Sequence, residues 1–221
     1  MGVEKGNFIE IEFTGKISET GKVFDTTNKK VAQESGIDTK DIKPFLLCVG
    51  HKMLPPGLDS DLKGKEVGKE YEVELNPEAA FGRRNPTLVQ TVPLKFFQSQ
   101  NINPQRGMQL SIDGKLARVL SSSGGRVLVD FNHPLAGKKV TYTYKILRMI
   151  TDEKEKVNAL QDFFFKQRFD FDIKEKNIIF KGDRNVEPII LLFKNKFKEI
   201  LGFEISFEEK DRKISLDTTK S

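Results

Sequence analysis

Cysteine and histidine, the residues most often used for covalent and metal chemistry, are nearly absent from this 221-residue chain. Its one cysteine is Cys48, so no disulfide can form within the chain and no thiolate cluster can bind a metal. Cys48 lies in the apolar run FLLCV at residues 45–49, where a small buried side chain is favoured over a nucleophile. The two histidines, His51 and His133, lack the spacing of metal ligands. We therefore expect neither a metal nor a cofactor.

The composition predicts a folded chain of one or two domains, because 37% of its residues are hydrophobic and 31% are charged. No run approaches the roughly 18 apolar residues of a membrane-spanning helix. The first ten residues lack the apolar core of a secretory signal, so we expect a cytoplasmic protein without membrane contact. Lys and Arg alternate with Asp and Glu despite the net charge of +5, a pattern typical of a solvated surface. Nucleic acid is therefore not expected as a partner.

The elements that must position any site begin with an antiparallel sheet. Ile9, Ile11 and Phe13 alternate with glutamates, which is the period of a half-buried strand. The ranges 71–75 and 140–146 repeat this alternation. Between the first two strands, residues 54–62 predict a turn followed by a short helix, with Gly64 closing it.

Residues from about 86 to 135 follow another pattern. Alternating apolar residues predict strands over 108–112, 116–120 and 127–131. Asp113 and Gly114 predict a tight turn between the first two strands, and residues 121–125 (SSSGG) predict the next turn. This small meander lies between two strands of the first sheet, so it is interpreted as an insertion.

A charged junction at residues 152–156 (DEKEK) precedes a third pattern. Helical spacing is followed by two alternating segments, then by a helix opened by Pro188 and stopped by Gly202, and then by another strand. The region 155–221 therefore predicts a separate α+β domain of the order α-β-β-α-β. The face expected to be apolar in the second helix comprises Ile189, Ile190, Phe193, Phe197, Ile200 and Leu201.

Several motifs, in order, resemble those of FKBP-type peptidyl-prolyl cis-trans isomerases. Residues 11–15 (IEFTG) and 21–27 (GKVFDTT) resemble the opening strand and its following turn. Residues 49–51 (VGH) with 54–58 (LPPGL) are similar to the family's pocket floor, and residues 76–82 (NPEAAFG) to its flap loop. The resemblance covers about residues 1–151. It implies an α+β fold in which an antiparallel half-barrel sheet surrounds a short helix.

The borders of the insertion are more specific. Residues 88–93 (LVQTVP) and 132–140 (NHPLAGKKV) resemble the borders of the insert-in-flap domain in SlyD-like members, and the chain is most similar to the longer archaeal members. The resemblance implies an isomerase domain made of 1–86 and 133–151, with an all-β peptide-binding insert at 87–132. The C-terminal α+β domain then occupies 155–221.

The resemblance also implies a pocket for the substrate proline. Phe24, Phe45 and Tyr142 would form its walls, and Asp25 would be a directed polar group near the rotating amide. The residues alone favour a core role for the aromatics and a turn role for Asp25, and it is the ordered set of motifs that favours a pocket. The full implied set is Phe13, Phe24, Asp25, Phe45, Leu54, Pro55, Leu58, Phe81 and Tyr142.

Four positions depart from the family's pattern. Leu58 stands where eukaryotic members usually have tryptophan, and Phe13 and Phe81 replace tyrosines. Pro55 stands where the family usually has a backbone N–H that bonds the ligand, and proline has none. These departures bear more on the binding of macrolide drugs than on catalysis.

The insert is expected to capture extended client chains through an exposed strand edge and a hydrophobic groove. Most of its apolar residues must also build its small core, and a folded decoration without a binding role is the alternative. The candidate peptide contacts are Phe96, Phe97, Ile102, Met108, Leu110, Leu120, Val129 and Phe131.

The predicted function is a prolyl isomerase (rotamase) that also acts as a chaperone on unfolded, proline-containing polypeptides. The alternative is a binding protein of the same fold with little catalysis. Region 155–221 predicts a homodimer, because three adjacent phenylalanines at 163–165 span too wide an arc for one buried stripe. SlyD-type members often carry a histidine-rich tail, but residues 206–221 contain no histidine, so no nickel is expected.

Overall fold

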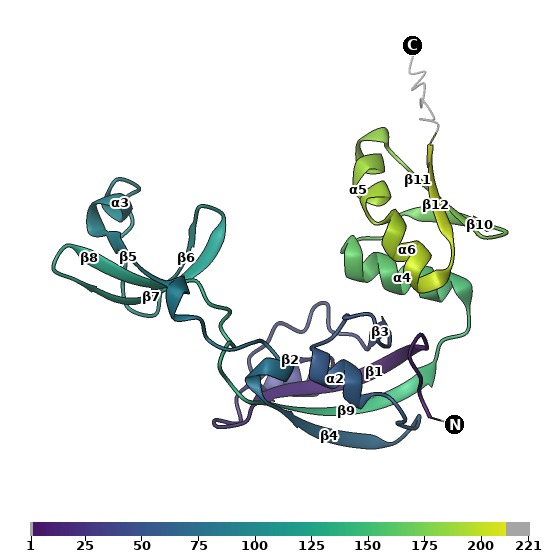
Figure 1. Cartoon of the computed structure of the whole chain (residues 1–221), viewed down its shortest axis with the longest axis horizontal. Coiled ribbons are helices and arrows are strands. Elements are labelled where there is room, and N and C mark those ends of the chain that lie inside the picture. Colours follow the sequence, from purple (N-terminus) through teal and green to yellow (C-terminus); the bar gives the residue numbers. More distant parts are fainter. Residues whose placement is uncertain (1, 211–221) are drawn as a thin grey trace, which may run out of the picture. The chain divides into compact units, whose positions relative to one another are not determined.

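The computed structural model describes residues 2–210, so residues 211–221 of the predicted C-terminal domain lie outside the described residues (Figure 1). Within that range, helices and antiparallel sheets occur together, which confirms the predicted α+β class. No described helix is long and apolar enough to cross a membrane. The chain forms two compact units: Met1–Thr14, Asp25–Glu72 and Thr143–Ser221 make the first, and Gly15–Phe24 and Val73–Tyr142 the second.

The largest sheet has five strands in the order β2-β1-β9-β4, with β3 paired to β1 (Figure 1). In β1 the side chains of Ile9, Ile11 and Phe13 are buried, which confirms that the alternation marked a strand. The strands predicted over 71–75 and 140–146 are also confirmed, as β4 and β9. The bounds are β1 Phe8–Ile17, β2 Val23–Thr26, β3 Phe45–Cys48, β4 Glu70–Leu75 and β9 Val140–Met149.

Short helices connect these strands. The predicted helix after residue 54 is α2, with Pro56 in its first turn, where a missing N–H costs nothing. Gly64 was expected to close α2, but the helix is capped by Leu62. Gly64 follows with a φ of +78°, and its N–H donates to the carbonyl of Val3 at 2.8 Å. The bounds are α1 Lys29–Glu34, α2 Pro56–Asp61, and the single 3-10 turns η1 Pro77–Ala79 and η2 Pro86–Leu88.

The inserted segment forms a four-stranded antiparallel sheet in the order β5-β8-β7-β6. The turn at Asp113 and Gly114 is confirmed, since both residues have a positive φ between β6 and β7. The core of the sheet is formed by Phe97, Ile112, Ala117, Val119, Val127 and Val129. The bounds are β5 Val89–Pro93, α3 Leu94–Gln98, β6 Gln109–Ile112, β7 Lys115–Ser123 and β8 Arg126–Asp130.

Two features of this segment were not predicted correctly. Residues 121–123 were assigned to a turn, but they extend β7 and pair with β8, so the turn is Gly124 and Gly125 alone. Strand β5 and helix α3 were missed altogether. Two glycines with positive φ suffice for a tight hairpin turn, which leaves the serines free to pair.

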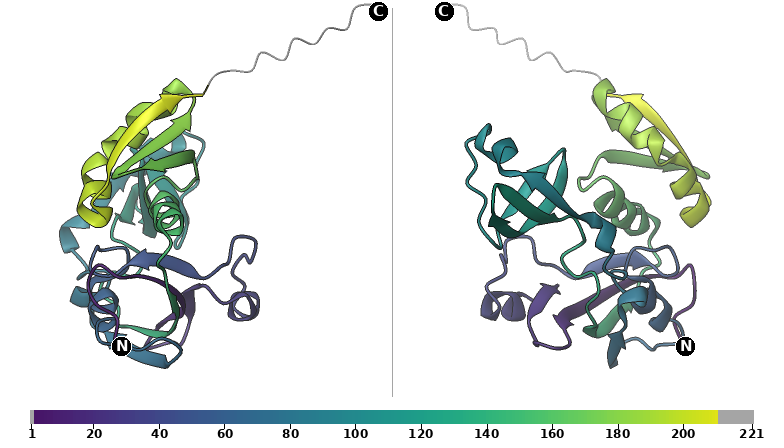
Figure 2. Two further views of the ribbon diagram at one scale, coloured as in Figure 1. Left: turned by 90° about the vertical axis from the view of Figure 1, so that its right-hand side faces the viewer. Right: turned by 60° about the vertical axis from the view of Figure 1, so that its left-hand side comes forward.

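The C-terminal segment forms a second mixed structure, shown from two sides in Figure 2. Its three-stranded sheet has the order β10-β11-β12, with β10 antiparallel and β12 parallel to β11. The expected second helix is split at Phe193 into α5 and α6, and Gly202 ends α6 with a φ of +74°. Ile189 was expected on a buried face but is exposed. The bounds are α4 Glu153–Phe164, β10 Asp170–Lys174, β11 Asn177–Gly182, η3 Arg184–Val186, α5 Glu187–Leu192, α6 Lys194–Leu201 and β12 Glu204–Glu209.

The three adjacent phenylalanines at 163–165 all find partners inside this segment. Phe164 stacks on Phe193 with ring centroids 4.9 Å apart, and Phe165 stacks on Phe197 at 5.8 Å. The ammonium of Lys166 lies 5.1 Å from the ring of Phe163. The width of the aromatic run therefore does not by itself require a second surface.

Candidate active site

The residues that follow Asp25 are hydrogen-bonded to β1 through threonine side chains. The hydroxyl of Thr26 donates to the carbonyl of Phe13 at 3.1 Å, and the N–H of Phe13 donates to the hydroxyl of Thr27 at 2.8 Å. The side chain of Asn28 then accepts from the first N–H groups of α1 and caps that helix. The three residues that follow Asp25 are thus held in place by hydrogen bonds.

The carboxyl of Asp25 has an unusual pKa. Desolvation raises the pKa of this carboxyl, and a hydrogen bond from the backbone N–H of Thr26 opposes the shift to a lesser degree. The residue as a whole is nevertheless exposed. An exposed residue with a desolvated carboxyl is expected at the mouth of a binding site.

The other predicted pocket residues in the same unit come from β1, β3 and the start of α2. Phe13 and Phe45 meet edge to face with centroids 6.5 Å apart. Leu58 is 0% exposed, and Leu54 and Pro55 are half-buried. Pro55 directly precedes α2 and has a φ of −51° and a ψ of 140°, so its backbone is outside the helical conformation.

The second unit holds the remaining three aromatics in one cluster. The ring of Phe24 meets both Phe81 and Tyr142 edge to face, each with centroids 5.7 Å apart. Tyr142 is 2% exposed, while Phe24 and Phe81 are half-buried. Edge-to-face pairs of this kind contribute about 0.5–1.5 kcal/mol beyond their burial. The three residues come from β2, β9 and the loop after η1, so the fold has brought together side chains far apart in the sequence.

Two residues that sequence reasoning missed support this cluster. The imidazole of His133 stacks on Phe81 with centroids 4.9 Å apart and planes 3° apart. Gly15 lies in β1 where a Cβ atom would be 2.6 Å from the Phe24 ring and 2.9 Å from the Tyr142 ring. An isolated glycine inside a strand is a signal of close approach and could have indicated Gly15. No sequence signal pairs His133 with Phe81.

Replacing Gly15 should therefore disturb the aromatic cluster. In a Gly15→Ala variant the methyl group must displace the rings of Phe24 and Tyr142, and such overpacking costs about 1–3 kcal/mol. We expect a lower melting temperature and isomerisation of a short peptide slowed about fivefold. Lys16→Ala, at the exposed neighbouring position of β1, is the matched control. Identical rates for Gly15→Ala and the unmodified chain would show that the cluster does not shape the site.

The candidate peptide contacts of the insert divide into two groups. Phe97 and Val129 are fully buried in its core, so they are not surface contacts in this structure. Ile102, Leu110 and Phe131 are partly buried against that core. Phe96 and Met108 are exposed at 37% each, and Leu120 lines a cavity. The accessible apolar surface of the insert is thus carried by fewer residues than the sequence predicted.

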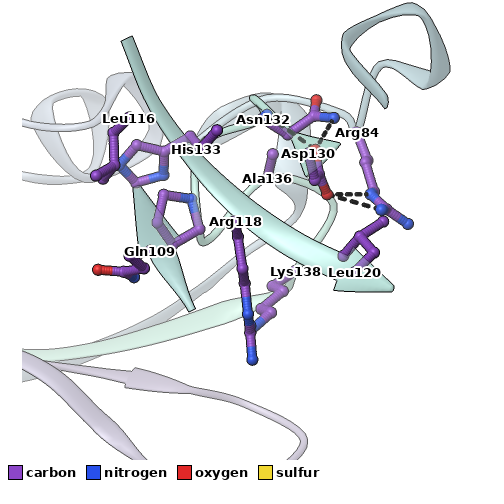
Figure 3. Close-up of a pocket in the computed structure, with 12 residues that line it drawn as sticks. Arg84, Gln109, Leu116, Arg118, Leu120, Asp130, Asn132, His133, Ala136 and Lys138 are labelled. Atoms are coloured by element: carbon purple, nitrogen blue, oxygen red, sulfur yellow. Dashed lines mark hydrogen bonds and ion pairs between the residues drawn. The ribbon is translucent and has the colours of Figure 1, made fainter. Parts of the chain in front are cut away.

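That cavity has a volume of about 260 Å³ and lies wholly within the second unit (Figure 3). It is lined by β6, β7 and β8 of the insert and by the returning segment 132–138. Reciprocal bonds hold the two connections of the insert together beside it: the N–H of Asn85 donates to the side chain of Asn132 at 2.8 Å, and the Asn132 amide donates to the Asn85 carbonyl at 2.9 Å.

Cys48 is buried, as predicted, and burial raises the pKa of its thiol to about 12. A thiol that stays protonated is neither a nucleophile nor a metal ligand. Among the described residues, no group of three His, Cys, Asp or Glu side chains could hold a metal ion. The candidate site therefore offers aromatic walls, aliphatic side chains and one carboxyl.

Comparison with known proteins identifies two matching families and several similar proteins. Residues 2–97 match the family described as FKBP-type peptidyl-prolyl cis-trans isomerase, and residues 90–135 match the one described as FKBP26, IF domain. A short-type peptidyl-prolyl cis-trans isomerase from Methanocaldococcus jannaschii is 32% identical over 155 residues, 69% of this chain and 98% of that protein.

Bacterial proteins are similar as well. The FKBP-type peptidyl-prolyl cis-trans isomerase SlyD of Aeromonas hydrophila is 32% identical over 148 residues, 66% of this chain and 63% of its own length. The FKBP-type 16 kDa peptidyl-prolyl cis-trans isomerase of Escherichia coli K12 is 30% identical over 152 residues, 66% of this chain and 93% of its own.

Proposed function

Because the chain belongs to the family of FKBP-type peptidyl-prolyl cis-trans isomerases, we propose that its isomerase site comprises Asp25 and the aromatic and aliphatic residues implied by the family's motifs. The chain is an enzyme that accelerates rotation about the bond before proline. The observation that best supports the assignment is the cluster of Phe24, Phe81 and Tyr142. The proposed site residues are Phe13, Phe24, Asp25, Phe45, Leu54, Pro55, Leu58, Phe81 and Tyr142.

The chemistry explains why such a site needs no nucleophile. Amide resonance sets a barrier of about 18–20 kcal/mol between the two isomers of the bond before proline. In the twisted amide this resonance is lost and the carbonyl carries less charge separation. An apolar pocket that excludes water therefore favours the twisted form over either planar form, which is the requirement for catalysis.

We assign distinct roles within this site. Phe24, Phe45 and Tyr142 are assigned as walls around the proline ring. Phe81 is assigned to the opening, and the buried Leu58 to the floor. The carboxyl of Asp25 is directed at the rotating amide, where its desolvation strengthens any electrostatic contact that it makes. The proposed site therefore acts through the shape of its aromatic walls and through one polar group, the Asp25 carboxyl.

A protease-coupled assay tests the proposal against its alternative, a binding protein with little catalysis. The full chain should accelerate isomerisation of a short Xaa-Pro peptide, and residues 1–151 should do so at a similar rate. Tyr142→Ala should slow it about tenfold, the usual loss for one directed contact. A full chain that binds the peptide but leaves its isomerisation rate unchanged would favour the alternative.

We also propose that the insert gives the enzyme a chaperone function. Its four-stranded sheet ends in two edge strands, β5 and β6, and an edge strand offers unpaired backbone groups to an extended chain. The exposed side chains of Phe96 and Met108 provide apolar surface on the same segment.

Self-association through the C-terminal segment is proposed on a revised surface. Because 163–165 pack internally, the exposed apolar side chains of α5 are the better candidates: Leu192 is 77% exposed and Ile189 is 49% exposed. We expect sedimentation to show a dimer for the full chain and a monomer for residues 1–151. Leu192→Asp should give a monomer, while Lys194→Asp should not. A monomeric full chain at micromolar concentration would contradict the proposal.

A further inference from the structure

The cavity beside the insert contains one carboxylate, and its hydrogen-bonding capacity is already used. One oxygen of Asp130 accepts from Nε and Nη2 of Arg84 at 3.1 and 2.7 Å (Figure 3). The other oxygen accepts from the backbone and side chain of Asn132 at 2.9 and 2.7 Å. Desolvation opposes ionisation, but the bonds from Asn132 and Arg84 outweigh it and lower the pKa of Asp130. Asp130 is therefore a charged but fully engaged acceptor.

Two cations of the same cavity are left without such a partner. Arg118 lies directly opposite Asp130 in the ladder between β7 and β8, yet the Asp130 carboxylate is bonded to Arg84 instead. Lys138 is half-buried in the returning segment. Within residues 2–210, neither Arg118 nor Lys138 makes an ion pair. Arg118 is exposed and Lys138 is half-buried, and the two unpaired cations together favour an added negative charge in this part of the cavity.

Apolar side chains lie beside these cations. Leu116 is 58% exposed because it points to the opposite face of β7 from the buried Ala117. Leu120 is the extra residue of a β-bulge, since Val119 and Ser121 pair with consecutive residues of β8. Bulges redirect side chains, and here Leu120 lines the cavity. The lining thus combines two unneutralised cations with exposed leucines.

We propose that this cavity binds an acidic side chain, Asp or Glu, within an apolar stretch of the client polypeptide. Charge complementarity selects the acidic residue, because the lining offers two unpaired cations and no free carboxylate. The leucines accommodate its apolar neighbours. The volume of about 260 Å³ fits one or two side chains and is too small for a folded partner.

His133 connects the cavity with the proposed isomerase site. Its imidazole lines the cavity and stacks on Phe81, which in turn meets Phe24 edge to face. A client held in the cavity therefore lies one side chain away from an aromatic wall of the site. Such tethering raises the local concentration of a nearby proline, so this inference rests on the proposed function and adds a substrate preference to it.

The test compares matched peptides on the full chain. Each peptide carries one Xaa-Pro bond, blocked ends and an apolar stretch, with Glu, Gln or Lys at one position that is moved along the stretch. Blocked ends exclude a contribution from a terminal carboxylate. We expect kcat/KM to be about three- to tenfold higher for Glu than for Gln at some positions, as two exposed charge contacts allow. The preference should weaken as salt is added.

Variants assign the preference to the cavity. Arg118→Gln combined with Lys138→Gln should bring the Glu-to-Gln ratio close to one, and Arg118→Glu with Lys138→Glu should shift the preference to Lys. The ratio cancels losses common to both peptides, such as those from partial misfolding. Arg126→Gln with Lys95→Gln is the control, because it removes equal charge from the insert outside the cavity and should leave the ratio unchanged.

The outcomes separate this inference from the proposed function. A full chain that isomerises none of the peptides contradicts the proposed function. A full chain that isomerises them all with a Glu-to-Gln ratio of one, or with a ratio that the double variants do not alter, overturns this inference alone. Binding of a short single-stranded RNA that depends on Arg118 and Lys138, without an acidic-peptide preference, would overturn it too.

Discussion

Replacing residues 89–130 by the two-residue loop Asn-Gly should separate isomerisation of a short peptide from the proposed capture of client chains. We expect the isomerisation rate of a short peptide to stay within a few fold of the unmodified chain. Catalysis of proline-limited refolding should fall by about two orders of magnitude, because tethering an unfolded chain beside a pocket raises effective concentration by at least that factor. Suppression of aggregation should be abolished.

The structure indicates where the loop can be closed. The N–H of Phe131 donates to the carbonyl of Leu88 at 2.9 Å, so the two ends of the shortened chain are already paired. The reciprocal bonds between Asn85 and Asn132 lie outside the deleted range and are kept. An Asn-Gly loop closes such a pair as a tight hairpin turn. The stacking of His133 on Phe81 also involves only retained residues.

The comparison of two substrates distinguishes loss of the insert from damage to the site. A damaged site would lower both the isomerisation rate of the short peptide and the rate of proline-limited refolding. Loss of client capture would lower only the refolding rate. As a milder variant, Phe96→Ser with Met108→Ser keeps the insert and removes two exposed apolar side chains, and it should give an intermediate loss in refolding. If the shortened enzyme accelerates refolding of its clients as much as the full chain does, the insert has no role in client capture.

Sequence periodicity predicted the strands well where one face is buried. The alternation of Ile9, Ile11 and Phe13 with glutamates is the direct result of a sheet with one apolar face, so β1 could be assigned from residue types alone. Strand β5 has no such pattern, because its residues are half-buried or exposed, and it was missed. Its pairing depends on β8, a partner that lies about forty residues later in the sequence.

The candidate site was harder to predict for a physical reason. A buried aromatic has the same sequence signature in a core and in a pocket wall, and Tyr142, at 2% exposed, illustrates this. Only the ordered set of family motifs identified Tyr142 as a candidate site residue. The cluster with Phe24 and Phe81 and the stacking of His133 depend on how distant segments meet. Gly15 differs in having a local signal, an isolated glycine inside a strand, although the rings that require it come from β2 and β9.

Asp25→Asn should slow isomerisation of a short peptide about tenfold, or roughly 1.4 kcal/mol of transition-state stabilisation. The substitution removes the charge and keeps an oxygen that can accept the bond from the N–H of Thr26. The unmodified enzyme should also lose rate as pH falls through the raised pKa of Asp25, above the usual carboxyl value of about 4. The Asn variant should lack this step in its pH–rate profile.

The same substitution should leave the fold as stable or more stable at neutral pH. A carboxyl whose pKa is raised by folding contributes stability that is present below its unfolded pKa and is lost as pH rises through its folded pKa. At pH 7 the ionised Asp25 therefore destabilises the folded state, and asparagine removes that cost. The melting-temperature difference in favour of Asn should shrink as pH falls through the folded pKa.

A matched control separates the site from a general effect of charge. Asp183→Asn makes the same chemical change at an exposed position in the C-terminal segment, and it should alter neither the rate nor its pH profile. An Asp25→Asn enzyme that keeps full activity, with its fold intact by circular dichroism, would show that the carboxylate does not act on the amide. Slower catalysis together with a more stable fold would instead show that Asp25 is retained for catalysis, because a residue kept for folding would destabilise the protein when replaced.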